Sequence, residues 1–142
     1  MSAINEWFGI YNGLCKYIRD TYGEEELAIY FKHLAKEAYS DVTPKFREGG
    51  LEAVRDRYVG NFIKDGGDGA ATATIDDGIL TIEVNCPAFT DAVDVKHPSR
   101  KVDGELCGFC HSLNLEVLDA AGYSFEHSYD GSGKCVFKIK KA

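Results

Sequence analysis

The spacing of hydrophobic positions predicts helices in the first half of the chain. Over residues 4–22 apolar side chains recur at steps of three and four, the period of an amphipathic helix: Ile4, Trp7, Phe8, Tyr11, Leu14, Cys15 and Ile18. Gly23 ends this helix, and a second is predicted from Glu24 to about Tyr39. Thr43-Pro44 interrupts the pattern. A third helix follows Gly49-Gly50, with its stripe at Leu51, Val54, Tyr58 and Phe62.

The period changes to alternation after the Gly-rich stretch 65–69. Residues 71–75 and 79–84 read as two strands, and Asp76-Asp77-Gly78 between them is a hairpin signal. A helix is then predicted over 104–121, with Asp103 as its N-cap and Gly122 as its stop.

A second hairpin closes the chain, with strands at 123–129 and 135–140. Three helices followed by β-β-α-β-β predict an α+β fold with an antiparallel sheet. At 142 residues the chain is expected to form a single domain. In it, residues 1–64 would form a helical layer and 70–140 the sheet with its helix.

Charge and composition narrow the class of partner. A net charge of −7 disfavours nucleic acid and anionic membranes, which would repel such a surface. The N-terminus lacks the pattern of a signal peptide, and no apolar run has the length of a transmembrane helix. We therefore expect a cytoplasmic protein with reduced cysteines, acting on a small molecule. A homo-oligomer is compatible with the sequence, which does not set the oligomeric state.

Four of the five cysteines lie in the C-terminal half. The alternation of the strands turns Cys86 and Cys135 toward the core, while Cys107 and Cys110 fall in the first turn of the last helix. There the helix dipole favours a thiolate. These four sulfurs are expected to converge, whereas Cys15 lies on the apolar face of the first helix and is expected to be core.

Three interpretations of the four cysteines remain open. Cys86, Cys107, Cys110 and Cys135 could bind zinc, with a histidine as an alternative ligand. Cys107 could instead act as a nucleophile, with His111 moving the proton. Plain burial is the third, because free cysteine is a common core residue. A thioredoxin-like redox pair is disfavoured, since no βαβ unit precedes the Cys-x-x-Cys.

Three further side chains are candidates for binding substrate. His97 and Arg100 lie in a polar loop that could bind a carboxylate, or could simply be exposed. His127 shares strand parity with Tyr123 and Phe125, which turns it inward, either to a substrate or to a backbone carbonyl. His111 has a surface position as its plain alternative.

The C-terminal half resembles the L-2-amino-thiazoline-4-carboxylic acid hydrolase family and, more distantly, vinyl-reductase-type small-molecule-binding domains. The resemblance covers about residues 58–140. It rests on Asn85-Cys86-Pro87 after a strand, on the helix with Cys107 and Cys110, and on the closing hairpin with Gly131, Gly133, Cys135 and Phe137.

The resemblance implies an α+β domain with a small-molecule pocket between helices and sheet, near Cys86, Cys107 and Cys135. For the hydrolases it implies hydrolytic opening of a thiazoline ring that bears a carboxylate, and for the binding domains, cysteines that hold zinc. Cys110-His111 departs from that pattern. The resulting hypothesis is a hydrolase of a small sulfur- and nitrogen-containing molecule. The alternatives are a non-catalytic metal- or ligand-binding module and an accessory protein with buried thiols.

Overall fold

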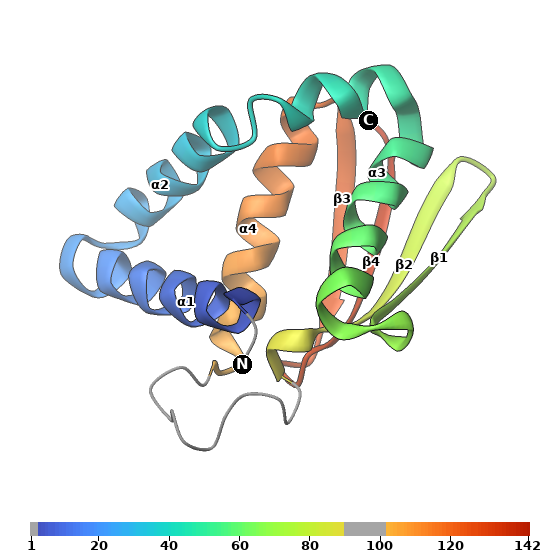
Figure 1. Ribbon diagram of the computed structural model, residues 1–142. Coiled ribbons are helices and arrows are strands. Elements are labelled where there is room, and N and C mark those ends of the chain that lie inside the picture. The colour runs from blue at the N-terminus through green and yellow to red at the C-terminus, as the bar shows by residue number, and fades with distance from the viewer. Residues whose placement is uncertain (1–2, 90–101) are drawn as a thin grey trace.

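The computed structural model describes residues 3–89 and 102–142, with side chains from Trp7 onward, and has the predicted α+β architecture (Figure 1). Helices α1 (Ala3–Tyr22), α2 (Glu24–Glu37) and α3 (Val42–Gly66) precede the first hairpin, and α4 (Glu105–Ala120) separates it from the second. Two short 3-10 turns, Asp68–Ala70 and Pro87–Phe89, follow α3 and β2.

The four strands form one antiparallel sheet in the order β1-β2-β4-β3. The first hairpin joins β1 (Ala71–Asp76) to β2 (Ile79–Asn85) through Asp77 and Gly78, which have φ values of 51° and 73°. Two positive φ values at a two-residue turn match the right-handed twist of the strands, so the Asp-Gly signal gave the predicted turn. The second hairpin pairs β3 (Tyr123–Tyr129) with β4 (Lys134–Lys141).

The helices cover one face of the sheet. Figure 1 shows α3 and α4 beside the strands, and α1 and α2 on the far side of α4. The inward side chains of the strands form the centre of the core, with Leu80, Ile82 and Ile139 fully buried. Outward residues such as Glu83, Glu126 and Lys138 are exposed. Because one face of the sheet is covered and the other is solvated, apolar and polar residues alternate along the strands.

The start of α3 differs from the prediction. Thr43 and Pro44 lie inside its first turn and do not interrupt it, because a proline there needs no intrahelical N–H partner. The real break is at Gly50, whose φ of 69° and ψ of −163° are non-helical. The half after Gly50 carries Val54 and Tyr58, the stripe that the sequence predicted.

Helix α4 begins at Glu105, one residue later than predicted, and its N-cap is Gly104 where the sequence predicted Asp103, which nevertheless contacts the first turn. The carboxylate of Asp103 accepts the backbone N–H of Glu105 at 3.2 Å and pairs with Lys16 of α1. Arg19 of α1 pairs with Glu105 at 2.8 Å. These two ion pairs hold α1 against the N-terminal end of α4, where two of the cysteines lie.

None of the helices in the described part of the chain is both long enough and apolar enough to cross a membrane.

Candidate functional site

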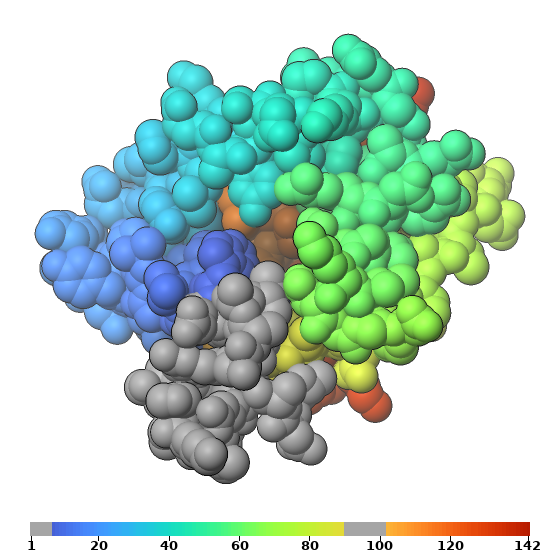
Figure 2. Space-filling view, viewed as in Figure 1, coloured from blue at the N-terminus to red at the C-terminus, as the bar shows by residue number. Residues whose placement is uncertain are grey.

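A cavity of about 430 Å³ lies between α1, α3, α4 and the inner face of the sheet. Figure 2 shows the surface of α4 at the bottom of a recess between α1–α2 and α3. The walls are mostly apolar and aromatic, and include Phe8, Phe62, Phe89, Leu113 and Phe137. A volume and lining of this kind are typical of small-molecule sites.

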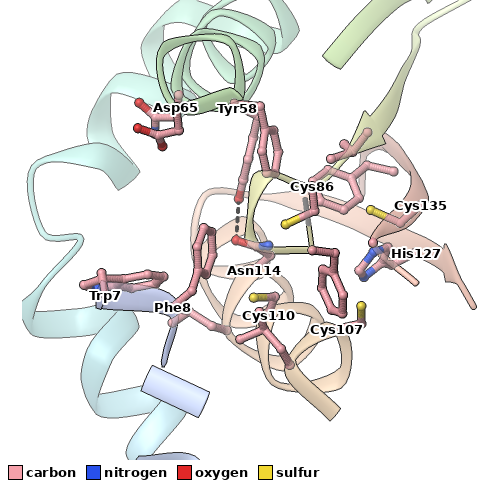
Figure 3. Close-up of a pocket in the computed structure, with 18 of the residues that line it drawn as sticks. Trp7, Phe8, Tyr58, Asp65, Cys86, Cys107, Cys110, Asn114, His127 and Cys135 are labelled. Carbon is pink, nitrogen blue, oxygen red and sulfur yellow. Dashed lines mark hydrogen bonds between the residues drawn. The ribbon is translucent and has the colours of Figure 1, made fainter. Parts of the chain in front are cut away.

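All four cysteines of the C-terminal half line this cavity. Cys86 directly follows β2, and its backbone N–H donates to the carbonyl of Gly133 at 2.8 Å. Cys135 lies on β4 opposite Val84, so the ladder brings these two cysteines to the same end of the sheet. Cys107 and Cys110 come from the first turns of α4. The predicted convergence of distant sulfurs is confirmed (Figure 3).

The fifth cysteine lies elsewhere. Cys15 is fully buried in α1 and is not among the residues that line the cavity. It is the core residue that the helical stripe predicted.

Cys107 has a distinctive environment at the turn between β3 and β4. The backbone N–H groups of Gly133 and Gly131 lie near its sulfur and lower its pKa, and these two glycines have φ values of 99° and 83°. Gly104 packs against this turn, since a Cβ there would lie 3.1 Å from the Cα of Gly131. The N–H groups of the two glycines therefore approach the Cys107 sulfur at the N-terminal end of α4.

Burial nevertheless keeps the cavity thiols protonated. It raises the pKa of Cys86 to about 11 and that of Cys135 to about 12. The pKa of Cys110 lies well above its ordinary value for the same reason. Burial also raises the pKa of Cys107, as does the negative charge of Asp130, and the N–H groups of Gly133 and Gly131 oppose these effects. At neutral pH, Cys107 would need a substrate or base to take its proton.

Of the histidines that the structure describes, His127 lines the cavity. Burial lowers its pKa to about 4, with the neighbouring His111 adding to the effect, so the ring is neutral at pH 7. Both ring nitrogens are buried and have no hydrogen-bond partner among the described residues. The ring packs edge-on against Phe137, with 4.6 Å between centroids. No backbone carbonyl of the described chain takes up its N–H.

His111 is not among the cavity-lining residues. Each residue of a helix turns by about 100°, so His111 lies about 40° to one side of Cys107, while Cys110 lies to the other. The ring of His111 stacks on Phe125 of β3, with 5.4 Å between centroids. Burial lowers its pKa. Its predicted role in moving the proton of Cys107 stays a prediction.

The described side chains do not form a ready metal site. No group of three or more His, Cys, Asp or Glu side chains within 3–89 and 102–142 is arranged to hold an ion. Cys86, Cys107, Cys110 and Cys135 surround one cavity but do not meet as the tetrahedral ligand set that zinc requires. They therefore do not fit zinc as they stand, and zinc binding stays a prediction.

Two predicted contacts, His97 and Arg100, lie outside the described residues. Sequence reasoning missed another pair, Tyr58 and Asn114, which both line the cavity. The hydroxyl of Tyr58 donates to Oδ1 of Asn114 at 3.0 Å. The sequence did contain an indication of Asn114. Cys107, Cys110 and Asn114 follow one another at steps of three and four, so Asn114 is a polar residue on an otherwise apolar helix face.

A scan of protein-family models and a search of curated proteins found no match to this chain.

Proposed function

We propose that this protein binds a small molecule in the thiol-lined cavity and hydrolyses it, with Cys107 as the nucleophile. The observation that carries the proposal is the position of the Cys107 sulfur, which lines the cavity and faces the N–H groups of Gly131 and Gly133. Those groups would stabilise negative charge on the sulfur when it forms or leaves. The resemblance to the thiazoline hydrolases suggests the substrate, a thiazoline ring with an amino group and a carboxylate.

The first half of the reaction opens the ring. Sγ of Cys107 bonds to the ring carbon of the C=N group, and the thiol proton passes to the ring nitrogen. The bond from that carbon to the ring sulfur then breaks. Its electron pair stays on the released sulfur, which takes up the proton from nitrogen and becomes a thiol. Direct proton transfer to a basic ring nitrogen suits Cys107, whose raised pKa keeps it protonated until substrate binds.

The second half releases the enzyme. Water adds to the same carbon, and the carbon–sulfur bond to Cys107 breaks to give a carbamoyl group and the free thiol. One proton of the water passes to the nitrogen of the C=N group, and the neutral ring of His127, which lines the cavity, can take the other and return it to the leaving sulfur. The net change is the addition of one water molecule to the substrate.

A turnover assay tests this proposal. The purified protein is incubated with 2-amino-thiazoline-4-carboxylate, and the ring-opened carbamoyl-cysteine is measured by liquid chromatography and mass spectrometry. We expect product with the wild type and with Cys15→Ala, whose sulfur lies outside the cavity, and a loss of at least 100-fold with Cys107→Ser. Turnover by Cys107→Ser at the wild-type rate would exclude Cys107 as nucleophile.

A second candidate is ligand binding without reaction. It is favoured by the raised pKa of every cavity thiol, since burial stabilises the unreactive form. Under this alternative the wild type would bind the thiazoline and release it unchanged. The same assay decides between the two, if binding is followed by calorimetry alongside product formation.

A further inference from the structure

The cavity has an uneven distribution of charge. Among its described lining residues, the charged side chains are Lys64 and Asp65, consecutive positions near the C-terminal end of α3. Figure 3 shows Asp65 and Trp7 on one side of the cavity, and His127 with Cys107 on the other. Trp7 is 44% exposed, which places that side at the mouth. The rest of the lining that the structure describes consists of neutral groups.

Asn114 contributes a side-chain amide to this neutral part of the lining. A hydrogen bond from Tyr58 fixes the orientation of that amide. Its Oδ1 is occupied by the hydroxyl of Tyr58, so its NH2 group remains to donate to a ligand. Burial raises the pKa of Tyr58, so that its hydroxyl stays a donor at neutral pH. Figure 3 shows the amide nitrogen between Tyr58 and the side of the cavity with Cys86 and His127.

We propose that the Tyr58–Asn114 pair determines ligand specificity, by selecting a flat, uncharged ring that carries a hydrogen-bond acceptor. The inference rests on the proposed function, since it takes this cavity as the ligand site. The aromatic side chains of Phe62 and Phe137 line the cavity and suit a flat ring. Among the described lining residues, no charged side chain lies inside to compensate a charged group for its lost hydration, so we place a substrate carboxylate at the mouth, where Lys64 lies.

Three probes of the same ring size test the inference without any turnover. Benzamide is neutral and carries a carbonyl acceptor, benzoate is its anionic counterpart, and toluene has no polar group. Their affinities are measured by titration of the ¹⁵N-labelled full chain, followed by NMR. We expect benzamide to bind at least ten-fold more tightly than either benzoate or toluene, and the side-chain NH2 signals of Asn114 to shift with benzamide.

Variants separate the amide from the rest of the cavity. In Asn114→Leu, which has a similar volume, the preference for benzamide over toluene should fall below two-fold while toluene binds as before. Tyr58→Phe should reduce the preference about three-fold or more, because the amide can then rotate. Asn85→Leu, which changes an exposed amide that does not line the cavity, should keep the full preference.

Several results would overturn the inference. These are benzoate binding as tightly as benzamide, an unchanged preference in both Asn114→Leu and Tyr58→Phe, and unshifted Asn114 signals in the wild type. The last measurement needs no variant, so it holds even if Asn114→Leu does not fold. A preference for benzamide in a protein that shows no hydrolysis would contradict the proposed reaction alone. Hydrolysis through Cys107 without that preference would contradict this inference alone.

Discussion

The imidazole rings of His111 and His127 stack on each other, with 5.5 Å between centroids and an angle of 27° between planes. Three of their four nitrogens are buried without a hydrogen-bond partner among the described residues: Nδ1 of His111 and both nitrogens of His127. Burial lowers the pKa of both groups, and their proximity lowers that of His127 further. Folding therefore favours the neutral pair over one that carries a proton.

This pair should make the protein less stable in mild acid. The unfolded chain binds a proton at His127 below pH 6.5, the folded chain only near pH 4, so stability is lost as the pH falls between those values. After discounting for partial exposure to water, we expect a loss of about 1 kcal/mol, or about 3 °C in melting temperature, between pH 7 and 5.

The control for this effect is a matched pair of variants. Thermal melts at pH 7 and 5 are compared for the wild type, for His127→Gln and for His33→Gln, which changes an exposed histidine of α2. The difference between the two pH values should shrink in His127→Gln and persist in His33→Gln. Equal pH dependence in all three proteins would show that His127 is not held neutral by the fold.

The cavity cysteines should differ in their reactivity. With iodoacetamide at pH 8, followed by peptide mass spectrometry, we expect Cys107 to be alkylated at least three-fold faster than Cys86, Cys110 or Cys135. Glycine N–H groups oppose the effect of burial at Cys107. All four rates should rise with pH, because the thiols are protonated at pH 7. Cys15 should stay unmodified in the folded protein, and its modification at the rate of Cys107 would indicate unfolding or a misplaced helix α1.

The turn that faces Cys107 should not tolerate a side chain at Gly133. A Cβ there would lie 2.7 Å from Cβ of Phe89, and the φ of 99° is unfavourable for any residue with a side chain. Gly133→Ala should therefore destabilise the protein by about 2–4 kcal/mol in urea unfolding.

Gly78→Ala provides the comparison, because its φ of 73° carries a similar backbone cost but no atom lies within 4 Å of the added Cβ. It should cost about 1 kcal/mol and leave the alkylation of Cys107 unchanged. A smaller loss of stability in Gly133→Ala than in Gly78→Ala would mean that the turn does not pack on Phe89.

The packing of helix α1 against α4 should be stabilised by one buried hydroxyl, in addition to the two ion pairs. Tyr11 is 4% exposed, and its OH donates to the carbonyl of Phe109 in α4 at 2.9 Å. Tyr11→Phe should cost about 1 kcal/mol of unfolding free energy, the usual net value of such a bond. Tyr17→Phe, on the exposed side of the same helix, should cost less than about 0.5 kcal/mol. Equal losses would show that the Tyr11 hydroxyl contributes nothing specific.

Periodicity was sufficient to predict the elements but not every boundary. The alternation of Leu80, Ile82 and Val84 predicted the inner face of β2, because one side of the sheet is covered and the other is solvated. The start of α3 could not be read in the same way. Its first half buries only Val42 and Phe46, too few positions to show a helical stripe, and Thr43-Pro44 looked like a break.

The candidate site was predictable only in part. Strand parity and helix position were enough to bring Cys86, Cys107, Cys110 and Cys135 together. Distances across the cavity depend on how α3 and α4 sit on the sheet, which no local pattern specifies. For that reason the sequence predicted Tyr58 only as part of an apolar helix stripe, although its hydroxyl bonds to an amide in the cavity. The same limit applies to His111, whose ring lies against β3 and whose predicted role beside Cys107 stays a prediction.

The most direct test of the nucleophile is the covalent intermediate. The protein is mixed with 2-amino-thiazoline-4-carboxylate, quenched in acid within seconds and examined by intact and peptide mass spectrometry. Opening of the ring by Cys107 keeps every atom of the substrate on the enzyme, so the account predicts a mass increase equal to one whole substrate molecule, located on Cys107. An adduct on a different cysteine, or product formed while Cys107 stays free at every quench time, would contradict it.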